Sequence, residues 1–368
     1  MKLSVLRFCS LAAIAAAMTA CSSDEPAQVA TSDVPLQGVT ITAQLPVENT
    51  LRPRAASNNM LASGNKVQRL IYAIYDLNTN EKLLSDKVLV TPGTKSFSFN
   101  VNLPVNAQYR LFMWADAGTF SKSSAEPYIV DTDAHTITMN TEALSDANWL
   151  NTSAEGLLYP VAEAQPDDMD AFMYFGSMFL TPASDGNSFT LTRPLVAMAF
   201  FSNATDAIYE AAKSPIVGST IHFGDTESYD FADSYNYFDD TVTMHQASNN
   251  YVNYVDFANG VNSFFCPWGF SKYKVLAYQY SFAPKNAANI PFETASLFAT
   301  FRYSDGSDDD RGHSYVNVDL GEPATWFKPN TCLAIIDDTD SNGGTSALIS
   351  NTNVTAKVSA GFDSNTRY

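Results

Sequence analysis

The stretch KSFSFNVNL, residues 95–103, alternates polar and apolar side chains over its whole length. Because alternate residues of a strand point to opposite faces, this alternation predicts a β-strand with one buried and one exposed face. A second stretch, GVTITAQL at residues 38–45, has the same period. The two apolar rows are Phe97, Phe99, Val101 and Leu103 in the first, and Val39, Ile41, Ala43 and Leu45 in the second. Rows of this kind line the core of a β-sandwich.

Short β-type runs continue through most of the 368 residues. RLIYAIYDL at 69–77 and YRLFMWAD at 109–116 are apolar on both faces, which indicates strands in the middle of a sheet. Turns rich in Asn, Asp and Gly separate the runs. A chain of this length also exceeds the usual size of one hydrophobic core. We therefore predict an all-β fold of two tandem antiparallel β-sandwich domains, residues 38–187 and 188–368, with a short helix in the second at ATDAIYEAAKS, residues 204–214.

The N-terminus has the pattern of an export signal. Lys2 and Arg7 precede an apolar, alanine-rich run that ends at Ala20 and is too short for a membrane span, which needs about 20 residues. We predict that residues 1–20 are a signal peptide. The junction before Cys21 resembles the lipobox of bacterial lipoproteins, and the SSDE that follows is similar to the surface-export tag of Bacteroidetes lipoproteins. The resemblance implies lipidation of Cys21 and a surface-exposed place on the cell outer membrane. The alternative is an ordinary signal peptide followed by an incidental cysteine.

Small polar and acidic residues dominate the segment at 21–37, which also contains Pro26 and Pro35. This composition predicts a flexible tether. The whole chain is acidic as well, with 39 acidic and 21 basic residues and a formal net charge of −18. Because an acidic surface repels phosphate, we expect no nucleic-acid partner. We also expect acyl chains, rather than basic patches, to hold the protein on lipid.

The sequence carries no pattern typical of a catalytic or metal site. The four histidines lack paired ligand spacing, and HExxH, GxSxG and glycine-rich phosphate loops are missing from the sequence. DDTDSNGG at 337–344 begins like a calcium loop, but Ile349 stands where its final glutamate belongs, so a polar turn is the better interpretation. We expect no enzymatic activity, no cofactor and no metal ion. Cys266 and Cys332 lie in apolar stretches and are either a disulfide pair or buried thiols.

Tyrosines and acids are mixed in SYDFADSYNYFDD at 228–240 and in NNYVNYVDF at 249–257. Exposed aromatic rings can stack on sugars while carboxylates bond the sugar hydroxyls, so these stretches suit a glycan-binding surface. Tyrosines that pack along a β-edge account for the same letters. Both interpretations stay open from the sequence.

The order of several apolar motifs resembles the fimbrillin family of Bacteroidales, which supplies lipoprotein pilus subunits. These motifs are VQRLIYAIYD, QYRLFMWADAG, DDMDAF, LTRPLVAMAFFSNATDAIYEAA and WFKPNTCLAII, and the resemblance covers most of residues 38–368. It implies two tandem transthyretin-like Greek-key β-sandwich domains and a structural role in a fimbrium. The implied partners are other fimbrial subunits, the same or related, and outer-membrane lipid. The alternative function is a monomeric outer-membrane lipoprotein that acts as an adhesin for host or dietary glycans.

The resemblance also implies that an N-terminal segment is removed after an arginine before the subunits polymerise. LRPRAASNN at 51–59 offers Arg52 and Arg54. Arg54 is the better candidate, because Arg52 precedes a proline, which most proteases reject. A plain linker that contains arginines is the alternative.

The last apolar run, NVTAKVSAGF at 353–362, has the same period as GVTITAQL near the N-terminus. Its alternating apolar row is Val354, Ala356, Val358, Ala360 and Phe362. If cleavage after Arg54 removes the first strand, the C-terminal strand of a neighbouring subunit can fill the groove that is left. We therefore predict that 353–362 is a donor strand. In the alternative, each of the two strands completes the sandwich of its own chain.

Overall fold

The computed structural model describes residues 27–28, 36–46, 64–119, 124–140, 150–152, 158–160, 166–182, 186–202, 216–223, 229–246, 274–292, 296–303, 313–337 and 354–360. The predicted lipidation site Cys21, the candidate cleavage sites Arg52 and Arg54, and the helix expected at 204–214 lie outside these residues. The DDTDSNGG turn lies outside them too, apart from Asp337.

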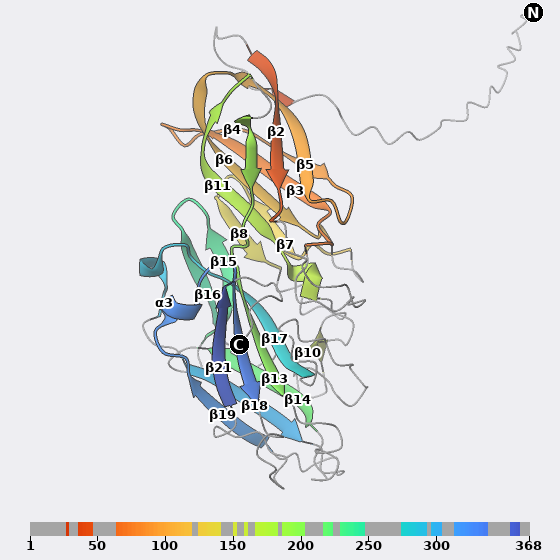
Figure 1. The fold of residues 1–368 in the computed structure, drawn as a ribbon, viewed down its shortest axis with the longest axis vertical. Helices are drawn as coiled ribbons and strands as arrows, with labels where there is room; N and C mark the ends of the chain where they lie inside the picture. The colour runs from red at the N-terminus through yellow and green to blue at the C-terminus, as the bar shows by residue number, and fades with distance from the viewer. Residues whose placement is uncertain are drawn as a thin grey trace, which may run out of the picture.

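Two four-stranded sheets form the β-sandwich of the first half of the chain, in the upper part of Figure 1. The outer sheet contains, in spatial order, β1 (Ala27–Gln28), β5 (Ser96–Pro104), β2 (Leu36–Gln44) and β12 (Ser188–Thr190). The middle sheet contains β11 (Phe172–Leu180), β6 (Ala107–Asp116), β3 (Arg69–Asp76) and β4 (Lys82–Leu89). The alternating rows of β2 and β5 meet the middle sheet in one apolar core. The strands predicted at 38–45 and 95–103 are therefore confirmed.

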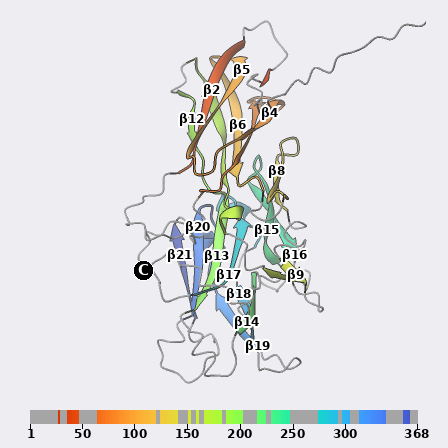
Figure 2. The same ribbon diagram turned by 90° about the vertical axis from the view of Figure 1, so that its right-hand side faces the viewer.

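Two further sheets form the second half. One contains β17 (Lys274–Phe282), β13 (Leu195–Ser202), β20 (Thr331–Asp337) and β21 (Val354–Ala360). The other has seven strands and includes β19 (His313–Asp319), β18 (Ser296–Tyr303), β14 (Ile216–Phe223), β15 (Tyr229–Asn236) and β16 (Thr241–Gln246). A separate hairpin joins β9 (Leu150–Thr152) to β10 (Leu158–Pro160). Figure 2 shows β12 beside β2 in the first half and β21 at the edge of its sheet in the second.

The predicted all-β fold is confirmed, and most neighbouring strands are antiparallel. Helical structure in the described part is confined to α3 (Pro323–Trp326) and the 3-10 turns η1 (Pro166–Met169) and η3 (Ala287–Asn289). Three pairs, β1 with β5, β2 with β12, and β13 with β20, run parallel. Long stretches of chain separate the partners in each of these pairs, which is what parallel pairing requires.

The two halves share one sheet. The hairpin of β7 (Tyr128–Asp131) and β8 (Thr136–Met139) follows the first-half strands in sequence, yet β8 pairs with β15 in the seven-stranded sheet. β12 still belongs to the first half, and the chain enters the second half at β13. The division into domains at residue 188 stays a prediction. β1 and the start of β2 at Leu36 also place parts of the expected tether, 21–37, in strands.

The two central strands of the middle sheet, β3 and β6, are buried on both faces. Leu70, Tyr72 and Ile74 of β3 face the sandwich core, and Ala73 and Tyr75 on the opposite face are buried as well. β6 behaves in the same way, with Leu111 and Met113 on the core side and Phe112, Trp114 and Asp116 on the other. This double burial explains why both strands read as apolar on both faces in the sequence.

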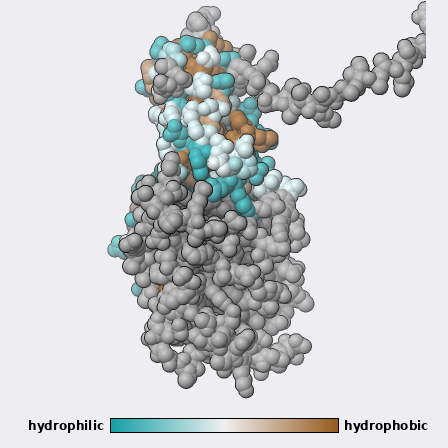
Figure 3. All heavy atoms as spheres, turned by 45° about the vertical axis from the view of Figure 1, so that its right-hand side comes forward, coloured by the Kyte–Doolittle hydropathy of each residue, from teal (hydrophilic) through white to brown (hydrophobic). Residues whose placement is uncertain are grey.

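The described surface of the first half is mostly hydrophilic or neutral, with small hydrophobic areas on the face shown in Figure 3. The large apolar side chains that are exposed in the described part are Leu36, Leu89, Ile129 and Phe179. Among the described residues, helices are too short and too polar to cross a membrane.

Candidate functional site

Strand β2 lies in the interior of the outer sheet, with β5 on one edge and β12 on the other. Its register with β5 places apolar residues opposite one another: Val39 and Val101, Ile41 and Phe99, Ala43 and Phe97. On the other face the threonine hydroxyls bond across the strands, Thr40 to Asn100 at 2.8 Å and Thr42 to Ser98 at 3.0 Å. The strand is therefore held along its length by main-chain bonds and along one face by burial.

The apolar row of β2 fills the space between β5, β12 and the middle sheet. Val39, Ile41, Ala43 and Leu45 are each at most 2% exposed. Full burial of a valine, isoleucine or leucine side chain is worth about 1.5–3 kcal/mol. Across the core, Tyr72 of β3 stacks on Phe99 with ring centroids 3.9 Å apart. Removal of β2 would leave a groove one strand wide with an apolar floor and two unpaired strand edges.

The candidate donor strand is an edge strand of its own sheet. β21 pairs antiparallel with β20 from Val354 to Ala360, and its other edge has no strand partner in the described part. Ala356 is exposed, whereas β20 is buried over its whole length. The last residue of the predicted donor row, Phe362, lies outside the described residues.

Gly64 lies between the arginine segment and β3, and its backbone is held by a hydrogen bond. The Gly64 N–H donates to Asp170 Oδ2 at 2.8 Å, and Gly64 has a φ of +61°. A Cβ atom at this position would lie 2.8 Å from Phe172 Cζ. Both the positive φ and the close ring therefore require glycine.

The acids of the DDMD motif anchor this region to the second half. Arg193 Nε donates to Asp170 Oδ1 at 2.7 Å and Nη2 donates to Oδ2 at 3.1 Å, a two-point contact between two buried side chains. Asp168 accepts from Lys66 Nζ at 2.7 Å. The Arg193 guanidinium also lies 4.5 Å from the centre of the Phe172 ring and reaches Asn330 Oδ1 at 3.5 Å. The acids Asp168 and Asp170 of the DDMDAF motif thus form a structural anchor.

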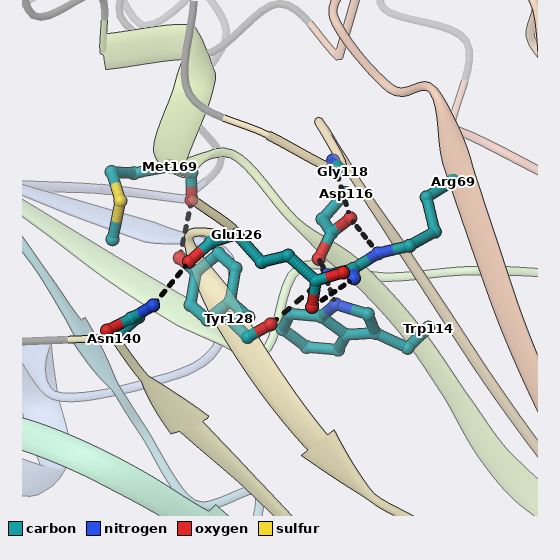
Figure 4. Close-up of polar contacts among 8 residues, drawn as sticks. All are labelled: Arg69, Trp114, Asp116, Gly118, Glu126, Tyr128, Asn140 and Met169. Atoms are coloured by element: carbon teal, nitrogen blue, oxygen red, sulfur yellow. Dashed lines mark hydrogen bonds and ion pairs between the residues drawn. The ribbon is translucent and has the colours of Figure 1, made fainter. Parts of the chain in front are cut away.

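A second buried ion pair lies at the same end of the middle sheet (Figure 4). Arg69 Nε and Nη2 donate to the two Asp116 carboxylate oxygens at 2.9 and 2.6 Å, and Nη1 lies 2.7 Å from Glu126 Oε2. Trp114 Nε1 and the Gly118 N–H donate to the same carboxylate at 2.8 Å. Burial by itself lowers the pKa of Arg69, but the hydrogen bonds and charges of Asp116 and Glu126 together outweigh it, so the pKa of the guanidinium is raised.

An aromatic layer joins the second half to the face of the middle sheet that points away from the sandwich core. Tyr237 stacks on Phe112 with ring centroids 4.0 Å apart, and its hydroxyl lies 2.7 Å from that of Tyr75. Phe238 stacks on His135 with ring centroids 3.9 Å apart, and the Arg110 guanidinium carbon lies 5.4 Å from the centre of the Phe238 ring. Burial raises the pKa of Tyr75 to about 12 and that of Tyr237 further, while burial lowers the pKa of His135.

This layer corrects one interpretation of the tyrosine–acid stretch at 228–240. Tyr235 and Tyr237 are at most 2% exposed, so their rings cannot stack on a sugar. The Tyr235 hydroxyl donates to Asp240, which also accepts from the N–H groups of Lys285 and Asn286 at 2.8 and 2.7 Å. The stretch therefore forms strand β15 and the turn that follows it, and Tyr235 and Tyr237 are buried. The second tyrosine stretch, 249–257, lies outside the described residues.

Sequence reasoning missed the residues that join the halves, because their partners are far apart in the chain. Tyr75 and Tyr237, for example, are separated by 162 positions. One signal was present: a charged residue begins the apolar run RLIYAIYD and another ends FMWAD, and these two, Arg69 and Asp116, are register partners. Cys332 is buried in β20, as an apolar stretch suggests, and Cys266 lies outside the described residues. Within the described part, groups of three or more side chains suited to a metal ion are not found.

A family of unknown function (DUF6562) matches residues 31–302 of the sequence. Curated proteins gave no match. Several solved structures of low identity are similar. One, from Parabacteroides distasonis and provisionally assigned to cell adhesion, has 10% identity and a TM-score of 0.41, with 90% of this chain and 98% of that chain covered.

Two fimbrial proteins from Porphyromonas gingivalis are among the similar structures. The tip fimbrial protein Mfa3 has 12% identity and a TM-score of 0.40 over 89% of this chain and 100% of that chain. The fimbrial anchor protein Mfa2 has 9% identity and a TM-score of 0.37 over 88% of this chain and 98% of that chain. Because these values are low, we base no inference about function on them.

Proposed function

The chain belongs to a family of unknown function (DUF6562), and from that premise we propose that it is a structural subunit of a cell-surface fimbria that joins its neighbours by strand exchange. The observation that carries the proposal is the position of β2. It is the first long strand among the described residues, it completes a sandwich core with one apolar row, and it lies between two other strands. The ordered motifs that resemble fimbrillins support the same role.

Cleavage after Arg54 would separate β2 from the rest of the fold. Arg54 lies between Pro46, just after β2, and Gly64, just before β3. β1 precedes β2, so both strands would leave with the cleaved segment, and β5 would lose both of its neighbours in the outer sheet. The exposed groove would present unpaired main-chain groups and the apolar floor. A strand from another chain can supply both kinds of contact.

The C-terminal strand of a second copy is the occupant we propose for this groove. It repeats the period of β2, with Val354, Ala356, Val358, Ala360 and Phe362 in place of Val39, Ile41, Ala43 and Leu45. β21 leaves one strand partner when it departs, whereas β2 is held on both edges. Donation from each chain to the next is a head-to-tail contact, which produces an open fibre.

The N-terminal leader gives the route to the surface in this proposal. Lipidation of Cys21 would tether the uncleaved subunit to the outer membrane, and cleavage after Arg54 would release it for assembly. The uncleaved subunit thus stays attached to the membrane and cannot assemble until cleavage removes β2. The adhesin alternative has lost the support of Tyr235 and Tyr237, which are buried.

The test compares the assembly of cleaved and uncleaved protein. The mature chain would carry a recognition sequence for a sequence-specific protease after Arg54, and its mass in solution would be followed by light scattering before and after cleavage. We expect monomers before cleavage and a ladder of higher masses after it. A matched chain that ends at residue 352 should stay monomeric after cleavage. A cleaved full-length chain that remains monomeric at high concentration refutes the proposal.

A further inference from the structure

We infer that the second half of the chain is a built-in scaffold that keeps the middle sheet folded when β1 and β2 leave. The inference rests on the proposed function, since it concerns the state in which the groove is open. A two-layer sandwich that loses the centre of one sheet exposes the core face of the other. Such a sheet needs another surface to hold it, because burial of apolar area is the main stabilising term.

The first support is the aromatic layer on the outer face of the middle sheet. Its contacts lie on the side away from the groove: Phe112 with Tyr237 at 4.0 Å, Phe175 with Tyr237 at 5.3 Å, and Trp114 with Phe282 at 6.3 Å. Phe112, Trp114 and Tyr237 are at most 2% exposed. Removal of β2 touches none of these contacts, so the burial of this face of the middle sheet survives cleavage.

The second support is the ionic anchor at the beginning of the middle sheet. After cleavage the new N-terminus lies upstream of Gly64, whose N–H is held by Asp170 at 2.8 Å. Asp170 is fixed in turn by Arg193, which lies between β12 and β13 and reaches Asn330 of the second half at 3.5 Å. The chain that leads into β3 therefore stays in place without β2.

The third support concerns the wall of the groove at β12. β12 pairs with β2, but the next residues are held by the middle sheet: the N–H of Thr192 donates to the Met173 carbonyl and the N–H of Met173 donates to that of Thr192, both at 2.8 Å. Arg193 follows directly and is ion-paired to Asp170. The β12 side of the groove is thus fixed to β11 and to the second half, and a new strand meets a prepared edge.

Because of these three features, the second half covers the face of the middle sheet that takes no part in strand exchange. We call this part of the scaffold the cover. In the intact chain the cover and β2 stabilise the sheet together. In the cleaved chain the cover acts alone. Weakening the cover should therefore matter little before cleavage and strongly after it.

Hydrogen exchange of β3 and β6 in the mature chain, with the protease site after Arg54, tests this directly. We expect cleaved wild-type protein to keep protection in both strands, even without a donor peptide. Tyr237→Ala should raise their exchange roughly tenfold after cleavage and much less before it, because it removes a stacked ring from the cover. Tyr237→Phe keeps the ring and loses the 2.7 Å contact to Tyr75, so it should raise exchange a few-fold only in cleaved protein.

The matched control is Tyr280→Ala, which removes a tyrosine that is 4% exposed and lies on β17 of the second half. In this variant, cleavage should change the exchange of β3 and β6 by the same factor as it does in wild type. The inference is overturned if β3 and β6 of cleaved wild-type protein exchange at the rate of unfolded chain, or if the two Tyr237 variants respond to cleavage as wild type does. Assembly is read separately. Cleaved protein that keeps protection but binds no donor strand supports the scaffold and counts against the proposed function alone.

Discussion

Replacement of Gly64 by alanine tests the anchor that follows the cleavage segment. The φ of +61° places the residue in the left-handed region, where a non-glycine residue costs about 1–2 kcal/mol. The added Cβ would also lie 2.8 Å from Cζ and 3.0 Å from Cε2 of Phe172. Phe172 is 1% exposed and carries Arg193 on its face, so it has little room to move. Overpacking of this kind costs about 1–3 kcal/mol.

Gly93→Ala provides the matched control. Gly93 has a φ of +84°, and a Cβ there would meet nothing within 4 Å, so it carries the backbone cost without the clash. Urea denaturation of the two variants should give a free energy of unfolding that is lower by about 2–5 kcal/mol for Gly64→Ala and by about 1–2 kcal/mol for Gly93→Ala. In a Phe172→Leu background the cost of Gly64→Ala should fall toward that of Gly93→Ala. Equal losses in the two single variants would refute the argument from the Phe172 contact.

Three other predictions follow from the junction and the leader. Because burial lowers the pKa of His135, the unfolded chain binds its proton more readily, so the free energy of unfolding should fall as the pH drops below about 6.5. His135→Asn, which suits the φ of +59°, should show a shallower fall in denaturation curves between pH 7 and pH 5, and an unchanged slope would count against this role. The pKa of Tyr75 is raised to about 12, so its stabilisation is complete below its ordinary pKa of 10 and is lost as the pH rises toward 12. Tyr75→Phe should flatten the decline over that interval, and parallel curves would exclude a contribution from Tyr75. Finally, Cys21→Ala should abolish incorporation of radiolabelled fatty acid and remove the protein from the outer-membrane fraction; continued labelling of the variant would rule out Cys21 as the acceptor.

The strands that the sequence predicts well are those with a regular period. β2 and β5 alternate without interruption, and each has one face in the core, so local pattern and tertiary structure agree. β4 was missed because Ser85, Asp86 and Lys87 break the apolar pattern of an edge strand that is largely exposed. β11 was missed for a different reason. Its sequence, FMYFGSMFL, contacts the core on one face and the second half on the other, and it shows no polar alternation.

The junction between the halves could not be predicted, because it depends on pairings that no local pattern contains. From the sequence, Tyr237 fitted an exposed sugar-binding ring as well as a ring packed along a β-edge, and its stack on Phe112 decides between the two. The sequence shows Asp168 and Asp170 only as neighbouring acids. Their role is clear once Lys66 and Arg193 are known to be their partners. Buried charges of this kind are informative only once their partners are known.

Strand exchange is the central claim, and the binding of a synthetic peptide of residues 353–362 tests it most directly. The peptide would be titrated into the mature chain that ends at residue 352, before and after cleavage at the engineered site after Arg54, with binding followed by fluorescence anisotropy. We predict saturable binding to the cleaved chain alone. A peptide with Val358→Asp, which places a charge in the apolar row, should not bind, because the groove floor offers it no partner. Absence of binding to the cleaved chain, or equal binding of the aspartate peptide, would contradict the account.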